Sequence, residues 1–257
     1  MEPATNNDET IATIAGWLRA ARHIVALTGA GISTESGIPD FRGPQGLWTK
    51  DPAAEKRATL QHYLANRDAR VQSWRNRLDG ALGGAEPNAG HFALVALEGK
   101  GRLQALVTQN VDGLHLRAGT SPAILTEIHG TVREYRCMGC PSRGPIEAVI
   151  ERVRAGEEDP PCRDCGGVLK AATISFGQDL VAEDLARSQE EAAAADLFLA
   201  IGTTLTVYPV ALMPEIALGR GARLVIINAG ETPFDPWAAA VLRTPIGQVL
   251  PQIVARV

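Results

Sequence analysis

The feature that most constrains this chain is a glycine-containing polar turn directly after a short apolar stretch. The stretch is Ile24–Thr28 and the turn begins at Gly29–Gly31. A short apolar run ending in a turn predicts a buried parallel strand. Glycines at this point let the backbone turn tightly and leave no Cβ between the chain and a ligand. Ser33 or Thr34 could cap a following helix, whose free N–H groups would attract a phosphate. The pattern is typical of a nucleotide diphosphate site.

The turn alone leaves two interpretations open. Thr34 stands where the dinucleotide fingerprint has its third glycine, so a strand-to-helix turn that binds nothing has the same pattern. The residues that follow favour binding. Pro39 stiffens the chain, and Asp40–Arg42 then supply an acid, an aromatic ring and a cation that folding does not require.

Apolar stretches alternate with amphipathic ones along most of the chain. This alternation predicts a Rossmann-like α/β fold with a doubly wound parallel sheet. Polar motifs follow several of the expected strands, so they should meet at the carboxyl edge of the sheet, where such folds bind ligands. Strands are expected at 24–28, 103–108, 123–127, 172–176, 197–201 and 224–228, and helices at 8–22, 88–98, 182–194, 209–218 and 246–255.

Two segments interrupt the alternation. Residues 46–84 are polar, with apolar side chains at helical intervals, and Gly83-Gly84 should end this helical insert. Residues 132–170 contain all the cysteines and should form a small zinc-binding module, too small to fold without its metal. The remaining residues, 1–45, 85–131 and 171–257, are expected to form the sheet domain.

The four cysteines form two Cys-x-x-Cys pairs, and 21 residues separate the pairs. Two disulfides are the alternative, but nothing in the sequence routes the chain to an oxidising compartment. The spacing matches a closed, tetrahedral, structural zinc site without an open position for water. The expected ligands are Cys137, Cys140, Cys162 and Cys165.

The composition is that of an ordinary globular chain of 257 residues, with 45% hydrophobic and 21% charged residues. A net charge of −4 gives no electrostatic reason to expect nucleic acid as a partner. No segment reaches the ~18 apolar residues of a membrane span. The acidic, polar N-terminus does not resemble a signal peptide, so a cytoplasmic protein is expected.

Four sets of motifs in the same order resemble those of the sirtuins, the NAD-dependent protein-lysine deacylases, in their bacterial form. They are the run 24–43, the segments Thr108–His115 and Glu127–Gly130, and the two cysteine pairs. The resemblance covers most of residues 15–250. It implies NAD as a consumed cosubstrate, structural zinc, and acyl-lysine proteins as substrates.

The resemblance implies that His129 is the catalytic base for a ribose hydroxyl of NAD, and a neutral imidazole suits this role. A lone histidine is otherwise more often structural, as His115 is expected to be. Asn110 would face the nicotinamide ribose and share the catalytic role. Asp112 would help to hold the loop. Both could instead be simple turn formers.

The cofactor roles implied by the resemblance extend along the whole sheet edge. Asp40 would bind the nicotinamide carboxamide, in a pocket lined by Ile38, and Phe41 would exclude water from the reacting ribose carbon. Arg42 would act near the phosphates or position the loop. The complete cofactor set is Gly29, Ala30, Gly31, Ser33, Thr34, Ile38, Asp40, Phe41, Arg42, Gln109, Asn110, Asp112, Gly202, Thr203, Thr204 and Asn228.

The substrate lysine would lie in a channel formed by Ile174, Phe176 and Gly177, and the peptide would add as a strand between this segment and Val207. Gln178 stands where the family has Glu, which removes a negative charge near the peptide. The implied product is O-acyl-ADP-ribose with free lysine and nicotinamide.

Three other functions share some of these features. A mono-ADP-ribosyltransferase would keep the cofactor and change the acceptor, but His129 and Asn110 favour deacylation. A non-catalytic NAD-binding module would not need the channel residue Phe176. A dehydrogenase would show a fuller glycine fingerprint.

Sirtuins that prefer succinyl or malonyl groups carry a Tyr-x-x-Arg pair in the helical insert. Here the aligned positions hold Arg75 and Leu78, and a shift of one residue gives Trp74 and Arg77. Tyr63 has Asn66 three residues on, so it does not supply the pair. The sequence therefore predicts that neutral acyl groups are removed faster than succinyl.

Overall fold

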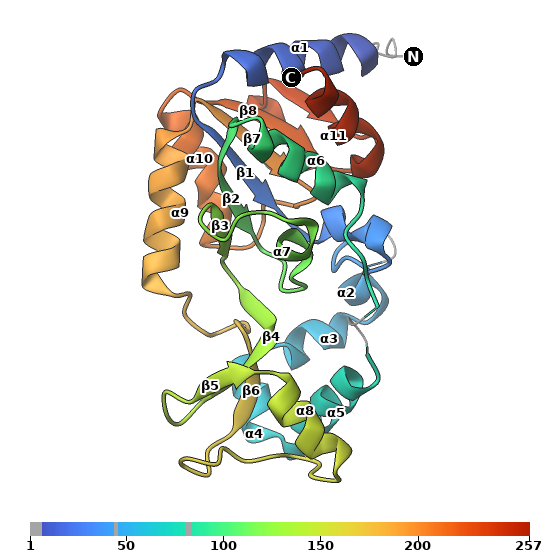
Figure 1. Cartoon of the computed structure of the whole chain (residues 1–257), viewed down its shortest axis with the longest axis vertical. Coiled ribbons are helices and arrows are strands. Elements are labelled where there is room, and N and C mark those ends of the chain that lie inside the picture. The colour runs from blue at the N-terminus through green and yellow to red at the C-terminus, as the bar shows by residue number, and fades with distance from the viewer. Residues whose placement is uncertain (1–6, 44–45, 81–83) are drawn as a thin grey trace.

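The computed structural model describes residues 7–43, 46–80 and 84–257, whose elements form two lobes (Figure 1). The large lobe is built on a six-stranded sheet of order β3-β2-β1-β7-β8-β9, in which every pair of neighbours is parallel. The predicted α/β architecture is confirmed. The strands are β1 Ile24–Thr28, β2 Leu103–Thr108, β3 Leu125–Glu127, β7 Leu197–Ile201, β8 Arg223–Ile227 and β9 Ala240–Leu242.

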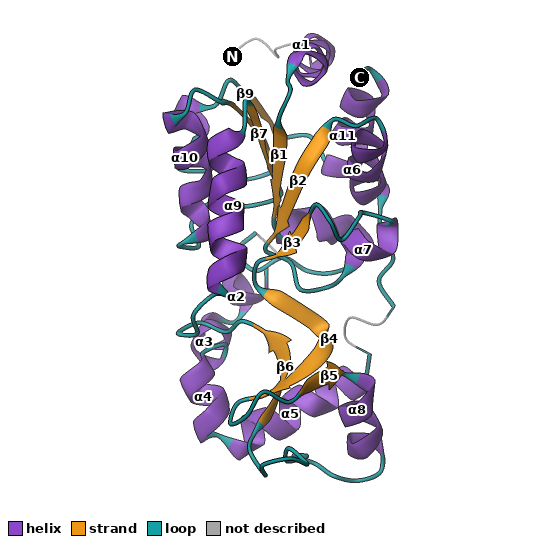
Figure 2. Ribbon diagram, turned by 60° about the vertical axis from the view of Figure 1, so that its left-hand side comes forward, coloured by secondary structure: helices purple, strands orange, loops and turns teal. Residues whose placement is uncertain are grey.

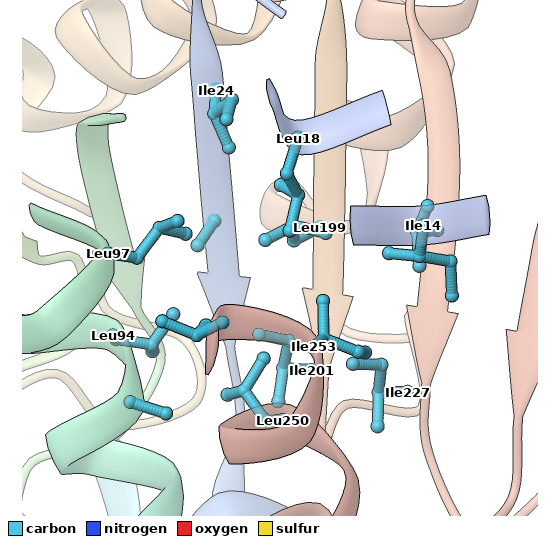
Figure 3. Packing of buried hydrophobic residues seen from close by; sticks show 14 of the residues in the cluster. Ile14, Leu18, Ile24, Leu94, Leu97, Leu199, Ile201, Ile227, Leu250 and Ile253 are labelled. Carbon is cyan, nitrogen blue, oxygen red and sulfur yellow. The ribbon is translucent and has the colours of Figure 1, made fainter. Parts of the chain in front are cut away.

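Helices cover both faces of this sheet (Figure 2). One face packs on α1 Asn7–Ala20, α6 Ala89–Gly99 and α11 Ile246–Ala255, and the other on α9 Ala182–Ala194 and α10 Met213–Gly219. Successive residues of a strand point to opposite faces, so a strand buried on both sides must be apolar along its length. Figure 3 shows the first of these two cores, where Leu18, Leu199 and Ile253 lie between helix and sheet.

The small lobe contains an antiparallel sheet of β4 Gly130–Cys137, β5 Arg143–Pro145 and β6 Leu169–Thr173, in the order β5-β4-β6. Around it lie α8 Glu147–Arg154 from the cysteine segment and α3 Pro52–Arg57, α4 Leu60–Ala65 and α5 Arg67–Leu78 from the insert. Trp74 of α5 is fully buried in one cluster with Cys137 and Leu169. The insert and the cysteine segment therefore share a core. Two short helices lie in the connections, α2 Leu47–Lys50 and α7 Leu114–Ala118.

The structure corrects one expected strand. Residues 172–176 were assigned to the main sheet, but β6 ends at Thr173 and pairs with β4 in the small sheet. Leu169 and Ala171 pack into the small core. An apolar run predicts a strand, yet it does not say which sheet will take it.

Other differences are local. The helix expected at 209–218 is divided into a 3-10 turn, Val210–Leu212, and α10, because Pro214 occupies the first turn of α10. The short strand β9 was not expected. Gly83 of the expected Gly83-Gly84 terminus lies outside the described residues, and the domain boundaries remain predictions. Among the described residues, no helix is both long and apolar enough to cross a membrane.

Candidate active site

The carboxyl ends of β1 and β2 lie side by side and begin the site. The hydroxyl of Thr28 donates to that of Thr108 at 2.8 Å, and Gln109 N donates to the Thr28 carbonyl at 2.9 Å. Since all six strands are parallel, the loops after β3, β7 and β8 reach the same edge.

The loops after β1 and β7 are in backbone contact. Gly29 N donates to Ile201 O at 3.0 Å, and Gly31 N donates to Gly202 O at 2.8 Å. A Cβ on Gly31 would lie 2.7 Å from Gly202 Cα, and Gly202 has a φ of +62°. The sequence analysis attributed Gly29 and Gly31 to the approach of a ligand. In the structure both are required first by the contact between the two loops.

Ser33 fastens the first loop to the second. The expectation that Ser33 or Thr34 caps a helix was wrong, because the turn enters a 3-10 helix, Ala30–Ser36, with no side-chain cap. Ser33 Oγ instead donates to Asp112 at 2.8 Å and accepts from Asn110 Nδ2 at 3.1 Å. Thr34 Oγ1 donates to the Gly31 carbonyl.

The loop after β2 is held by its own polar side chains. Asn110 is 8% exposed, and its Nδ2 also donates to Gly29 O at 3.1 Å. Asp112 accepts from Leu114 N at 2.9 Å, which matches the loop-holding part of its expected role. Gln109 Nε2 donates to Thr203 Oγ1 at 2.8 Å. Three loops thus form one hydrogen-bonded unit.

His129 follows β3 and is oriented by a neighbouring carbonyl. Its Nδ1 lies 3.1 Å from Gln109 O. Because a carbonyl can only accept, Nδ1 carries the proton and Nε2 is left as a basic lone pair. Burial lowers the pKa of His129 from its usual 6.5, against the opposing effect of the Gln109 hydrogen bond, so the ring is neutral at pH 7. No hydrogen bond engages Nε2 within the described part of the chain.

The backbone around His129 joins the two lobes. Ile174 N, from the expected substrate channel, donates to the His129 carbonyl at 2.8 Å. Gly130 has a φ of +74°, and a Cβ there would lie 2.1 Å from Ala172 O. The expected base and the expected channel are therefore held at fixed positions relative to each other.

The segment after Pro39 forms an aromatic and ionic cluster. The Phe41 ring lies 4.7 Å from that of Trp48, and Arg42 stands 4.4 Å over the same indole while pairing with Glu55 at 3.0 Å. These contacts fit the loop-positioning role considered for Arg42. Asp40 accepts from Gly43 N at 3.1 Å. Trp48 and Glu55 were not identified from sequence, and no motif marked them.

The remaining expected cofactor residues lie at the same edge. Asn228, 8% exposed at the end of β8, donates through Nδ2 to Gly230 O at 2.9 Å. Thr204 shares a 2.8 Å hydroxyl contact with Thr206. Ile38 is half-buried just after the 3-10 helix. None of these bonds prevents ligand binding, because each leaves acceptor or donor capacity on the side chain.

The expected substrate segment is braced by the insert. Phe176 N donates to Ala58 O at 3.2 Å, and Leu60 N donates to Phe176 O at 2.9 Å. Gln178 accepts from Ser175 N at 3.3 Å, so its amide stabilises the turn containing Gly177. The backbone N–H of Phe176 is therefore already engaged by the insert. The contact with Ala58 was missed, since the sequence does not show pairing between distant segments.

The four cysteines meet in the small lobe. The Sγ atoms of Cys137, Cys140, Cys162 and Cys165 all lie within 4.8 Å of one another. The Sγ atoms are 3.5 Å apart in Cys137 and Cys165 and 3.7 Å apart in Cys140 and Cys162, too long for disulfides, and all four cysteines are free. A tetrahedral zinc with Zn–S bonds of about 2.3 Å sets its sulfurs about 3.8 Å apart. The donor set therefore fits zinc.

Comparisons with known proteins agree with this geometry. The model of the Sir2 family matches residues 29–209. The chain belongs to the Sir2 family. It is 48% identical over 231 residues to "NAD-dependent protein deacetylase 2" of Streptomyces coelicolor, covering 90% of this chain and 96% of the relative. It is 44% identical over 249 residues to "NAD-dependent protein deacetylase" of Haloarcula marismortui, covering 96% and 95%.

Solved structures of the Sir2 family show the same fold. One is a Sir2 variant with a deacetylated p53 peptide and 3′-O-acetyl ADP-ribose, with a TM-score of 0.87, 34% identity, and coverage of 95% of this chain and 97% of the other. Another is Sir2 with a p53 peptide and NAD+, with a TM-score of 0.84, 34% identity, and coverage of 95% and 96%.

Proposed function

We propose that this member of the Sir2 family is an NAD-dependent protein-lysine deacetylase that forms nicotinamide and O-acyl-ADP-ribose. The observation that carries the proposal is the fixed tautomer of His129. Its Nδ1 proton is engaged by Gln109 O. Nε2 of the neutral ring makes no hydrogen bond with the residues that the structure describes, so it can accept a proton at the loop edge. Relatives named deacetylases and a Sir2 structure with peptide and NAD+ support the same reaction.

In the proposed reaction, the acyl-lysine carbonyl oxygen attacks C1′ of the nicotinamide ribose, and the C1′–N bond breaks with its electron pair leaving on nicotinamide. His129 Nε2 then takes the proton of a ribose hydroxyl, whose oxygen attacks the acyl carbon. Asn110 would face this ribose, and Phe41 would keep water from C1′. The bond from the acyl carbon to the lysine nitrogen then breaks, and the nitrogen keeps the electron pair and takes a proton, which frees the lysine. A water molecule adds to the acyl carbon, the bond from that carbon to the C1′ oxygen breaks, and the acyl group remains on the other ribose oxygen of ADP-ribose.

The zinc would be structural. Cys137, Cys140, Cys162 and Cys165 supply four thiolates, so no position is left for water or substrate. The metal would fix the small lobe and, through β6, the channel segment at Ile174 and Phe176. Thiolates grouped for a metal suit a reducing compartment, so a cytoplasmic location is part of the proposal. The net charge of −4 supports protein rather than nucleic-acid substrates.

The test is incubation of the purified protein with NAD and acetyl-lysine peptides, read by mass spectrometry. Deacetylated peptide with O-acetyl-ADP-ribose is expected. Peptide that gains ADP-ribose and keeps its acetyl group would support the mono-ADP-ribosyltransferase alternative, and labelled NAD would reveal that product on a gel. Formation of neither product would contradict the proposal.

A further inference from the structure

Trp48 lies between the ring expected to cover the reacting ribose and the ring expected to line the acyl-lysine channel. Its indole is 4.7 Å from the Phe41 ring and 5.5 Å from the Phe176 ring. Within the described part of the chain, Phe41 and Phe176 make no ring contact with each other. Trp48 is therefore their common aromatic neighbour, and it lies on α2, between the large lobe and α3 in both views (Figures 1 and 2).

The backbone fixes Trp48 to the Phe41 segment. Leu47 N donates to Asp40 O at 2.9 Å, and Trp48 N donates to Phe41 O at 2.9 Å. A Cβ on Gly46 would lie 2.6 Å from the Phe41 carbonyl carbon, so the segment is closed tightly on itself. A shift of the backbone at Trp48 is therefore transmitted to the backbone at Phe41.

The indole of Trp48 is also engaged by a cation. Arg42 stands 4.4 Å over the ring, and its guanidinium pairs with Glu55 of α3. A cation held over tryptophan by a second ion pair restricts both side chains. The two phenylalanine rings that contact Trp48 keep exposed surface, since Phe41 is 42% and Phe176 is 36% exposed.

We propose that Trp48 is a positioning residue that couples the acyl-lysine channel at Phe176 to the water-excluding position of Phe41. The proposal rests on the function proposed above. If Phe41 is displaced, water can reach C1′ after nicotinamide leaves. Water oxygen then bonds to C1′ and loses its proton, which gives ADP-ribose without acyl transfer. Nicotinamide release would exceed deacetylation.

The experiment measures nicotinamide and deacetylated peptide in the same reaction at saturating acetyl-lysine peptide. The wild-type protein should form them in equal amounts. Trp48→Ala should lower kcat/KM for deacetylation by up to about 10²-fold, as expected for a misplaced reacting geometry, and should release excess nicotinamide. Trp48→Phe keeps an aromatic ring and should restore most of the equal stoichiometry.

Trp17→Ala is the matched control, because Trp17 of α1 is also half-buried beneath an arginine, with Arg223 at 5.5 Å over its ring. It should keep equal product amounts. Equal amounts from Trp48→Ala, at normal or lowered rate, would overturn the inference, as would the same nicotinamide excess from Trp17→Ala. A wild-type protein that forms no deacetylated peptide would contradict the proposed function itself.

Discussion

The six-stranded sheet buries apolar side chains on both of its faces, whereas the small lobe packs one core around Trp74 and the cysteine pairs. The first arrangement supplies its own driving force, since burial of apolar area dominates folding. The second has a core of a size that usually needs a metal. His129 and Asn110 follow strands of the self-sufficient lobe, while Phe176 follows a strand of the metal-dependent one. The conditions that displace His129 and Asn110 should therefore differ from those that unfold the segment containing Phe176.

Zinc removal should give the largest difference in stability between the two lobes. We expect chelation, or Cys162→Ala, to unfold the small lobe and abolish deacetylation, because the cysteines then no longer hold a zinc ion in common. Hydrogen exchange should show protection lost in β4, β6 and α8 but retained in β1 and β7. Active protein without zinc in metal analysis would contradict the assignment.

The pH dependence of kcat/KM should reflect the titration of His129, which follows a strand of the large lobe. The folded-state pKa of His129 lies below 6.5 because of burial, and the proposed base acts as a neutral ring. We expect kcat/KM to be flat above pH 7 and to fall about tenfold per unit once pH drops below that pKa. Circular dichroism at each pH is the control for metal loss from the cysteines. An activity loss centred above pH 7 would contradict the assignment.

Two core substitutions compare the lobes directly. Trp74→Ala should destabilise the small lobe by about 3–5 kcal/mol, and Leu199→Ala the large lobe by about 2–5 kcal/mol. Both side chains are almost fully buried, at 0% and 1% exposure. Melting with and without added zinc separates them, because only the Trp74 variant should be rescued by the metal. Equal rescue of both variants would mean that the lobes unfold as one unit.

The smallest effect concerns the acyl group. Arg75 is exposed and pairs with Glu158 at 2.5 Å, whereas Arg77 is half-buried near Tyr63 and its side chain makes no hydrogen bond or ion pair among the described residues. We still expect acetyl-lysine to be processed with a higher kcat/KM than succinyl-lysine on one peptide, since no tyrosine accompanies Arg77. Faster desuccinylation that is lost in Arg77→Leu would show that the expected register of the insert is wrong.

Local patterns in the sequence predicted much of the large lobe. The strands at 24–28 and 197–201 and the helix at 182–194 agree at both ends, because apolar runs and glycine turns are local signals. The cysteine spacing likewise predicted the cluster that the structure shows. The small sheet, the support of Phe176 by Ala58, and the place of Trp48 depend on contacts between distant segments. The hydrophobic periodicity of the sequence does not predict such contacts.

The glycine turn shows a subtler limit of the sequence. Its pattern predicted a tight turn at Gly29 and Gly31, but the neighbour that excludes a Cβ is Gly202, far along the chain. The ring orientation of His129 likewise depends on the carbonyl of Gln109. The sequence can identify such residues as candidates, but their positions and orientations depend on the fold.

The measurement that tests the central claim most directly is nicotinamide exchange in His129→Ala. Deacetylation should fall by about 10²–10⁴-fold, as expected for loss of a positioned general base. Labelled nicotinamide should still exchange into NAD when acetyl-lysine peptide is present, because nicotinamide leaves before the base acts. Near wild-type deacetylation by this variant, or loss of exchange together with deacetylation in a folded protein, would contradict the account.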